Sequence, residues 1–207
     1  MREIISGLLA ILLLICSVSA SANELELLAL AADQVGLTLQ KSPVLYFYIS
    51  KATSLPILFT LVEDRNITPV PDIPLKSPSG PGLEAIRLGD YQIVLEENVQ
   101  YHWYVSVIRN PDSRSRDIVV GGVIERVDPF LVNYYGRKCD RDAVRYLQEA
   151  EIWYDAFACV NELIDANPQD KTLRDLRGEL LGRPKSFLYL LPTELLYLEP
   201  SQETISR

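Results

Sequence analysis

The hydrophobic period of the chain changes near Pro129, and this change limits the possible folds more than any other feature of the sequence. Before it, short runs rich in β-branched and aromatic residues are separated by turn-forming residues, which is typical of β-strands. After it, apolar residues recur every three to four positions, which is typical of amphipathic helices. A block of strands followed by a block of helices indicates the α+β class.

Residues 101–108 (YHWYVSVI) form the strongest predicted strand of the first region. Because successive side chains of a strand point to opposite faces, Tyr101 and Trp103 share the face that we assign to the core. The opposite face carries His102, Tyr104, Ser106 and Ile108. The other predicted strands cover residues 44–49, 57–62, 83–88, 91–95 and 118–127. Short strands with turn signals at this spacing predict an antiparallel β-sandwich over residues 23–130.

Two local patterns refine the predicted sandwich. Residues 69–82 contain five prolines, which leave too few N–H groups for a strand ladder, so we expect an extended loop or an edge strand there. Leu95 lies six residues before Tyr101. Immunoglobulin-like and fibronectin-like sandwiches have a leucine and a corner tyrosine at this spacing, and the tyrosine hydroxyl bonds the backbone a few residues upstream. The sequence therefore favours a sandwich of this type.

Residues 137–183 are predicted to form a helical hairpin followed by a third helix docked on the sheet. Asp170 or Thr172 is expected to cap the third helix, which runs to Leu181 and is stopped by Gly182 and Pro184. Two apolar stripes define the hairpin: Cys139, Ala143, Leu147 and Ala150, then Ile152, Ala156, Cys159 and Leu163. The segment EIWYDAFACVNELIDANPQD, with Trp153 and Ala156, resembles the second helix of a tetratricopeptide repeat. No second copy follows at a period of about 34 residues, so a repeat array is not expected.

The first residues have the pattern of a secretory signal peptide. Arg2 precedes an unbroken apolar run over residues 7–15, and Ala20-Ser21-Ala22 offers the small residues that signal peptidase requires. We expect cleavage after Ala22, with an uncleaved anchor as the alternative. Ile15 before Cys16 argues against a lipoprotein, and no later stretch is long and apolar enough to span a bilayer. The sequence therefore predicts an exported, soluble protein in the periplasm or outside the cell.

The charge and the scarcity of reactive side chains exclude some classes of function. The chain has 28 acidic and 20 basic residues, a net charge of −8, which argues against a nucleic-acid partner. His102 is the single histidine, so a multi-histidine metal site is excluded, and we expect no metal and no cofactor. His102 itself is expected to be a partly exposed residue of the sheet face.

Cys139 and Cys159 are the two cysteines that remain after removal of the signal peptide. Their stripes face each other across the predicted helical turn, and their spacing does not match a zinc or redox motif. In an oxidising compartment we favour a disulfide over two buried thiols, with a contribution of about 3 kcal/mol to stability.

The candidate binding residues lie on the exposed strand face and in one loop. Tyr104 beside His102 offers an aromatic patch for a protein partner or a sugar ring. The loop of residues 110–116 (NPDSRSR) holds Arg114 and Arg116, which are either merely solvated or contact an acidic ligand.

The remaining features have a plain structural interpretation. Adjacent carboxylates Glu96-Glu97 and Asp140-Asp142 are expected to face water rather than to form acid/base pairs. Asn66-Ile67-Thr68 fits a glycosylation sequon. The apolar tail, residues 184–207, is interrupted by Pro192 and is expected to pack back on the sandwich, with an exposed protein-binding patch as the alternative.

Several blocks in this order resemble the DUF928 family, exported bacterial proteins of unknown function. The blocks contain Pro43 and Tyr46-Phe47-Tyr48, then Tyr101 to Tyr104, then Ser115, Gly122, Ile124 and Arg126, and finally Ile152 to Ala156 and Asn167-Pro168. The resemblance covers residues 36–180 and implies export and architecture, but no catalytic residues. The chain lacks the glycine-rich, cysteine-containing N-terminal stretch of many members, and residues 184–207 extend past the usual end.

Together these observations predict an exported, non-enzymatic accessory or protein-binding module of the bacterial cell envelope. A carbohydrate-binding sandwich that uses Tyr104 is the alternative, and a hydrolase that uses scattered carboxylates such as Glu96 or Asp140 is the second alternative. The expected partner is therefore an envelope protein or a glycan, and the sequence leaves the oligomeric state open.

Overall fold

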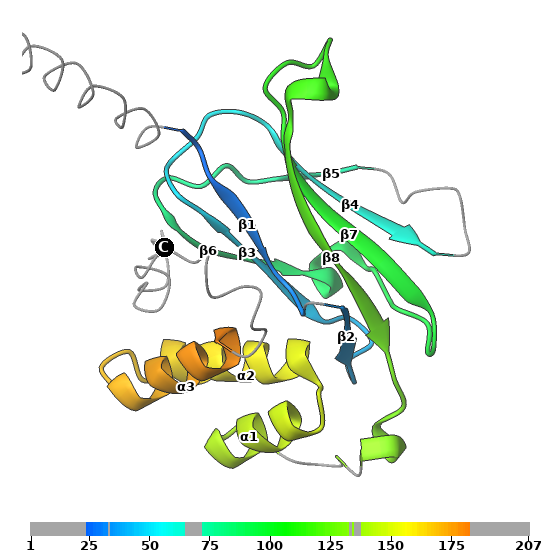
Figure 1. Ribbon diagram of the computed structural model, residues 1–207, viewed down its shortest axis with the longest axis vertical. Helices are drawn as coiled ribbons and strands as arrows, with labels where there is room; N and C mark the ends of the chain where they lie inside the picture. The colour runs from blue at the N-terminus through cyan, green and yellow to red at the C-terminus, as the bar shows by residue number, and fades with distance from the viewer. Residues whose placement is uncertain (1–23, 33, 65–71, 133, 135–137, 183–207) are drawn as a thin grey trace, which may run out of the picture.

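Eight strands precede three α-helices in the computed structural model, which describes residues 24–32, 34–64, 72–132, 134 and 138–182 (Figure 1). The strands are β1 (Leu27–Leu30), β2 (Val35–Thr38), β3 (Val44–Ile49), β4 (Ile57–Glu63), β5 (Ile73–Leu75), β6 (Gly82–Arg87), β7 (Gln100–Val107) and β8 (Ile118–Arg126). The helices are α1 (Arg141–Glu149), α2 (Trp153–Ala166) and α3 (Lys171–Leu181). The predicted α+β class is confirmed. The predicted signal peptide, sequon and apolar tail lie outside the described residues.

The strands form a three-stranded sheet in the order β1-β3-β6 and a five-stranded sheet in the order β2-β8-β7-β4-β5. All neighbouring strands are antiparallel except β2 and β8, which are parallel. The prediction of a wholly antiparallel sandwich is wrong at this pair. The chain passes directly from β1 in one sheet to β2 in the other, and this crossing brings β2 beside β8 in the parallel direction. The proline-rich β5 lies at a sheet edge, as predicted, because an edge strand can do without some of its N–H donors.

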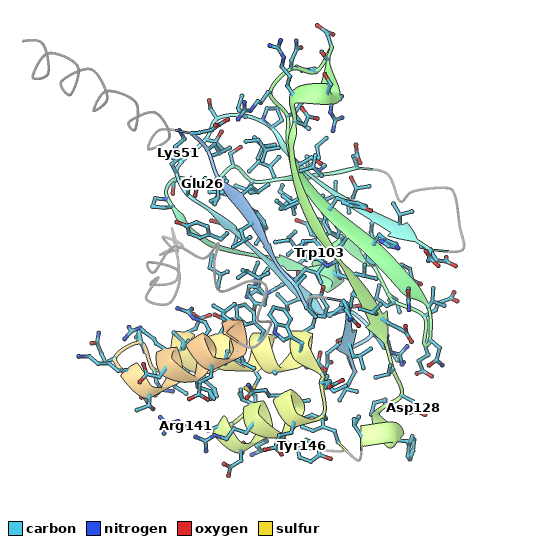
Figure 2. All side chains as sticks on the ribbon, viewed as in Figure 1. Glu26, Lys51, Trp103, Asp128, Arg141 and Tyr146 are labelled. Carbon is cyan, nitrogen blue, oxygen red and sulfur yellow. A yellow bond between two sulfur atoms is a disulfide. The ribbon has the colours of Figure 1, made fainter. Side chains whose placement is uncertain are left out.

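The inner faces of the two sheets enclose the first hydrophobic core. Trp103 of β7 and Phe59 of β4 are fully buried in it, and Figure 2 shows Trp103 between the sheets. Tyr101 is 8% exposed, and its hydroxyl accepts a hydrogen bond from the backbone N–H of Glu96 at 3.2 Å. This is the upstream backbone contact that the spacing of Leu95 and Tyr101 predicts.

A second hydrophobic core joins the outer face of the three-stranded sheet to the helices. Tyr46 and Tyr48 of β3 and Leu30 of β1 contribute to it from the sheet. The ring of Phe157 in α2 meets Tyr46 edge-on, with the ring centroids 5.1 Å apart. The described residues therefore form three layers: helices, three-stranded sheet and five-stranded sheet. Figure 1 shows the helices gathered at one end of the sandwich, and no described element covers the outer face of the five-stranded sheet.

Three predictions about the strands need correction. Residues 91–95 are not a strand: a 3-10 turn, Leu88–Tyr91, ends at Gln92, whose φ of 58° breaks the extended backbone. Ser106 and Ile108 are buried, not exposed, since Ser106 lies between Leu58 and Val119 in the sheet register and their larger side chains flank it. The sequence interpretation also missed β1 and β2, which are only four residues long: β1 (LLAL) has no β-branched residue, and β2 (VGLT) has Gly36 between its Val35 and Leu37.

Aspartates cap two of the three helices, and the cap of α3 is one of the two residues predicted; α2 begins after Ile152 without a side-chain cap. Asp140 caps α1 by accepting the N–H of Ala143 at 2.7 Å. Asp170 caps α3 by accepting the N–H of Thr172 at 3.0 Å, and Gly182 follows its last residue. Side-chain oxygens at these positions satisfy N–H groups that have no partner within the helix.

Candidate functional site

The outer face of the five-stranded sheet, which we call the open face, carries the two exposed residues predicted on β7. Tyr104 lies between Thr60 of β4 and Gly121 of β8 in the register of the sheet. Its side chain is 38% exposed. His102 lies one row away on the same face and is half-buried. Strand alternation therefore predicted the face on which both residues lie. The rule holds here because β7 is the central strand of its sheet and its opposite face is buried.

Gly121 gives the ring of Tyr104 room to lie close to the sheet. A Cβ atom at this position would be 2.8 Å from Cδ1 of Tyr104 and 2.1 Å from the carbonyl oxygen of Trp103. The missing side chain opens a shallow hollow of about 280 Å³, lined by His102, Tyr104 and residues 119–123. An aromatic ring held beside a hollow offers a large contact area that loses little conformational entropy on binding.

Three pairs of polar side chains accompany Tyr104 on the open face. His102 Nε2 lies 3.3 Å from Asp64 Oδ1. The Thr60 hydroxyl donates to Asp72 Oδ1 at 2.6 Å, and the side-chain amide of Gln100 donates to Glu125 Oε2 at 2.9 Å. Each carboxylate keeps further lone pairs for a ligand that donates hydrogen bonds. An aromatic platform with acceptors around it suits a polyhydroxylated ring or a polar protein surface.

The two arginines of the predicted binding surface lie elsewhere. Arg114 and Arg116 belong to a 3-10 turn, Arg114–Arg116, in the hairpin between β7 and β8, which projects beyond the sheets in Figure 1. Arg114 forms an ion pair with Asp117, and Arg116 is exposed. The structure therefore brings His102 and Tyr104 together but leaves the two arginines at the hairpin tip.

The carboxylates considered for acid/base chemistry have structural contacts. Asp140 caps α1, and Glu97 forms an ion pair with Arg126, whose guanidinium also donates to the carbonyl oxygen of Leu95 at 3.2 Å. Glu96 and Asp142 are exposed. Among the residues that the structure describes, no three His, Cys, Asp or Glu side chains are grouped closely enough to hold a metal ion.

Helix α2 meets the five-stranded sheet at a buried junction that centres on Trp103. Its Nε1–H donates to the hydroxyl of Tyr154 at 2.9 Å, and this hydroxyl donates to the carbonyl oxygen of Val123 at 3.3 Å. Burial raises the pKa of Tyr154, so its hydroxyl stays protonated. Gly36 of β2 makes room for the ring, since a Cβ there would be 2.4 Å from Tyr154 Cε2. Side chains from β7 and α2 thus meet inside the molecule.

Asp155 is the second part of this junction, and sequence reasoning missed it. Its carboxylate accepts the hydroxyl of Thr38 at 2.5 Å and the backbone N–H of Leu39 at 2.9 Å. Burial raises the pKa of Asp155 to about 6, and the hydrogen bonds from Thr38 and Leu39 oppose this rise. The contact ties the first turn of α2 to the end of β2. The one feature of the sequence that could have indicated a buried Asp155 is its position as an acidic residue within the apolar segment WYDAF.

A model of the DUF928 family, a domain of unknown function, matches residues 16–186, well over half of the chain. The chain belongs to the DUF928 family. No curated protein matches it. The described residues contain no helix that is long and apolar enough to cross a membrane.

The sequence blocks that resemble DUF928 proteins converge on the buried junction. Trp103, Gly122, Tyr154 and Asp155 belong to these blocks and meet there. A Cβ at Gly122 would be 3.1 Å from Trp103 Nε1, so glycine allows the indole to approach β8. In the same DUF928 block, Ala156 is fully buried, and the ring of Trp153 stacks on Phe157 with centroids 5.0 Å apart. These residues hold the layers together.

The two cysteines of this DUF928 chain lie at disulfide distance. Their Sγ atoms are 2.13 Å apart and their Cα atoms 5.5 Å apart. The pair connects the residue before the cap of α1 to the middle of α2. Because α2 also carries Tyr154 and Asp155, the pair ties α1 to the helix that contacts the sheets.

Proposed function

We propose that this protein is an exported, non-enzymatic binding module of the bacterial cell envelope that recognises an envelope protein through its open face. The observation that supports this most is Tyr104, an exposed tyrosine beside a hollow on a sheet face that no described element covers. The cysteine pair at disulfide distance and the predicted signal peptide are in keeping with an oxidising compartment outside the cytoplasm.

The choice of a binding role follows from how Tyr104 is held. A tyrosine that lies against the sheet has few alternative rotamers, so binding costs it little entropy. Its ring supplies apolar contact, and the neighbouring Asp64, His102 and Thr60 supply hydrogen-bonding groups. Aromatic anchors with polar neighbours are typical of the central residues in protein interfaces.

An affinity capture from envelope extract tests this proposal. The wild-type protein and two variants, Tyr104→Ala and Tyr91→Ala, serve as bait. Tyr91 has the same exposed fraction of 38% but lies on a 3-10 turn, so it is a matched control for loss of a surface aromatic ring. A protein retained by the wild type and by Tyr91→Ala but lost with Tyr104→Ala supports the proposal. Equal capture by all three baits contradicts it.

A carbohydrate-binding module is the second candidate, and the same face favours it. Sugar rings stack on flat aromatic side chains and donate hydroxyl protons to carboxylates such as Asp64 and Asp72, which flank Tyr104. Binding to isolated wall polysaccharide that disappears in Tyr104→Ala but not in Tyr91→Ala would identify this function. A hydrolase remains the second alternative; turnover of a glycan or peptide that is abolished in Glu96→Gln or Asp140→Asn would establish it.

We also infer that the β-layers are of the immunoglobulin or fibronectin type and that the α1–α2 hairpin is tetratricopeptide-like. The hydrogen bond from Glu96 to the hydroxyl of Tyr101 supports the first inference. The fully buried Ala156 of α2, within the core that the helices share, supports the second. Both architectures present binding surfaces in many proteins, although neither by itself defines a function.

A further inference from the structure

A second hollow, of about 660 Å³, lies at one end of the sandwich. It is built by three separate segments: Glu24 before β1, residues 51–55 between β3 and β4, and Arg109 after β7. Figure 2 shows Lys51 at the end of the sandwich remote from the helices. This hollow is separate from the open face, because its lining residues do not include His102 or Tyr104.

Two cations in this hollow face one carboxylate. Arg109 Nη2 lies 2.8 Å from Oε1 of Glu24. The hydrogen bond and charge of Arg109 lower the pKa of Glu24, and the charge of Lys51 lowers it further. The positive charges of Lys51 and Arg109 therefore both attract a negative charge at the position of the Glu24 carboxylate. Such a position suits an anionic oxygen, since arginine can bind a carboxylate or a phosphate with two parallel N–H groups.

The rest of the hollow is suited to a larger molecule than a single ion. Ala52 and Leu55 add apolar surface to its wall. Thr53 contributes a hydroxyl whose oxygen accepts the N–H of Leu55 at 3.1 Å, which leaves its proton available to a ligand. The side chain of Glu24 is 64% exposed, so it can leave Arg109 without exposing buried surface.

We propose that this hollow binds the carboxylate or phosphate group of an anionic envelope ligand, and that the side chain of Glu24 occupies the anion position in the free protein. Glu24 is then an internal competitor: a ligand must displace it from Arg109. This site goes beyond the proposed function, because it uses a different surface and a ligand of defined charge. In a protein with a net charge of −8, the two cations give this end a local attraction for anions that the whole molecule lacks.

Titration of the ¹⁵N-labelled protein with inorganic phosphate and, separately, with glucuronate tests the proposal and distinguishes the two anion classes. The readout is the shift of the backbone amide signals of residues 51–55, with uncharged glucose as the reference ligand. Arg109→Gln should weaken binding by about threefold and Glu24→Gln should strengthen it by about threefold, as expected for exposed ion pairs. Arg145→Gln, which removes the same charge from the exposed face of α1, should leave the affinity unchanged.

The opposite effects of the two variants separate a site from general charge attraction. The proposal is overturned if neither anion shifts residues 51–55, if Glu24→Gln binds no more tightly than the wild type, or if Arg145→Gln weakens binding as much as Arg109→Gln. Binding of only one anion assigns the ligand class. Loss of the open-face interaction in Tyr104→Ala leaves this result untouched, so the two proposals can fail independently.

Discussion

Replacement of Asp155 by asparagine should remove a pH dependence that the fold contains. Burial raises the pKa of Asp155 from its ordinary 3.8 to about 6, so the folded protein binds this proton more tightly than the unfolded chain does. The stabilisation by the bound proton is therefore complete below about pH 4 and is lost as the pH rises through about 6. At about 1.4 kcal/mol per pH unit, the difference between the two pKa values corresponds to about 3 kcal/mol.

An asparagine side chain in place of Asp155 would keep the shape and the contacts of the protonated carboxyl group. Its amide oxygen can accept the N–H of Leu39, and its NH₂ group can donate to the hydroxyl of Thr38, which now lies 2.5 Å from the carboxylate. The Asp155→Asn variant should therefore gain stability relative to the wild type between pH 4 and pH 7, by up to about 3 kcal/mol. A gain in stability is the opposite of what the loss of a carboxylate with two hydrogen bonds would ordinarily cause.

Urea unfolding at pH 4, 5, 6 and 7, followed by the fluorescence of Trp103 and Trp153, measures this difference. Every other titrating group contributes equally to both proteins, so only the difference in their free energies of unfolding is informative. Parallel stability curves over this range would refute the reasoning, since Asp155 would then titrate alike in the folded and unfolded states.

Three further predictions concern the contacts between layers. Tyr154→Phe should lower the free energy of unfolding by about 1–3 kcal/mol in urea denaturation, because the indole N–H of Trp103 loses its buried acceptor; no loss would mean that the bond is not made. Gly122→Ala should cost about 1–3 kcal/mol, measured as a lower melting temperature, since its Cβ would lie 2.5 Å from a neighbouring side-chain carbon; an unchanged melting temperature would contradict this packing. Mass spectrometry without reductant should find no alkylatable thiol at Cys139 or Cys159, and the double serine variant should lose about 3 kcal/mol; two labelled thiols would reject the bond.

Alternation and periodicity predicted the parts of the fold that depend on local sequence. The core-facing side of β7 at Tyr101 and Trp103 and the capping of α3 follow from side chains within a few residues of each other. The strands β1 and β2 could not be predicted in this way. Each is only four residues long, β1 has no β-branched residue and β2 contains Gly36, and neighbouring strands of the sheets hold both in place. The parallel pairing of β2 with β8 joins segments far apart in the chain, which no local pattern encodes.

The same distinction applies to the candidate site. Tyr104 and His102 were placed by alternation, but the hollow beside them depends on Gly121 in another strand. Asp155 was missed because its partners, Thr38 and Leu39, lie more than a hundred residues earlier in the chain. Within α2 alone, an aspartate in the first turn has an ordinary interpretation as a favourable charge near the helix N-terminus.

Within residues 101–104 of β7, two side chains pack in the core and two lie on the open face. Tyr101 and Trp103 are buried and hold the layers together, so the architecture accounts for them. Tyr104 is 38% exposed, and its ring lies over Gly121, a cross-strand contact that also favours the sheet. The exposed part of the ring is available to a partner, and a large aromatic side chain held against an uncovered face is the kind of residue that contributes most to binding. Tyr104 is accordingly the residue at which packing and recognition can be tested separately.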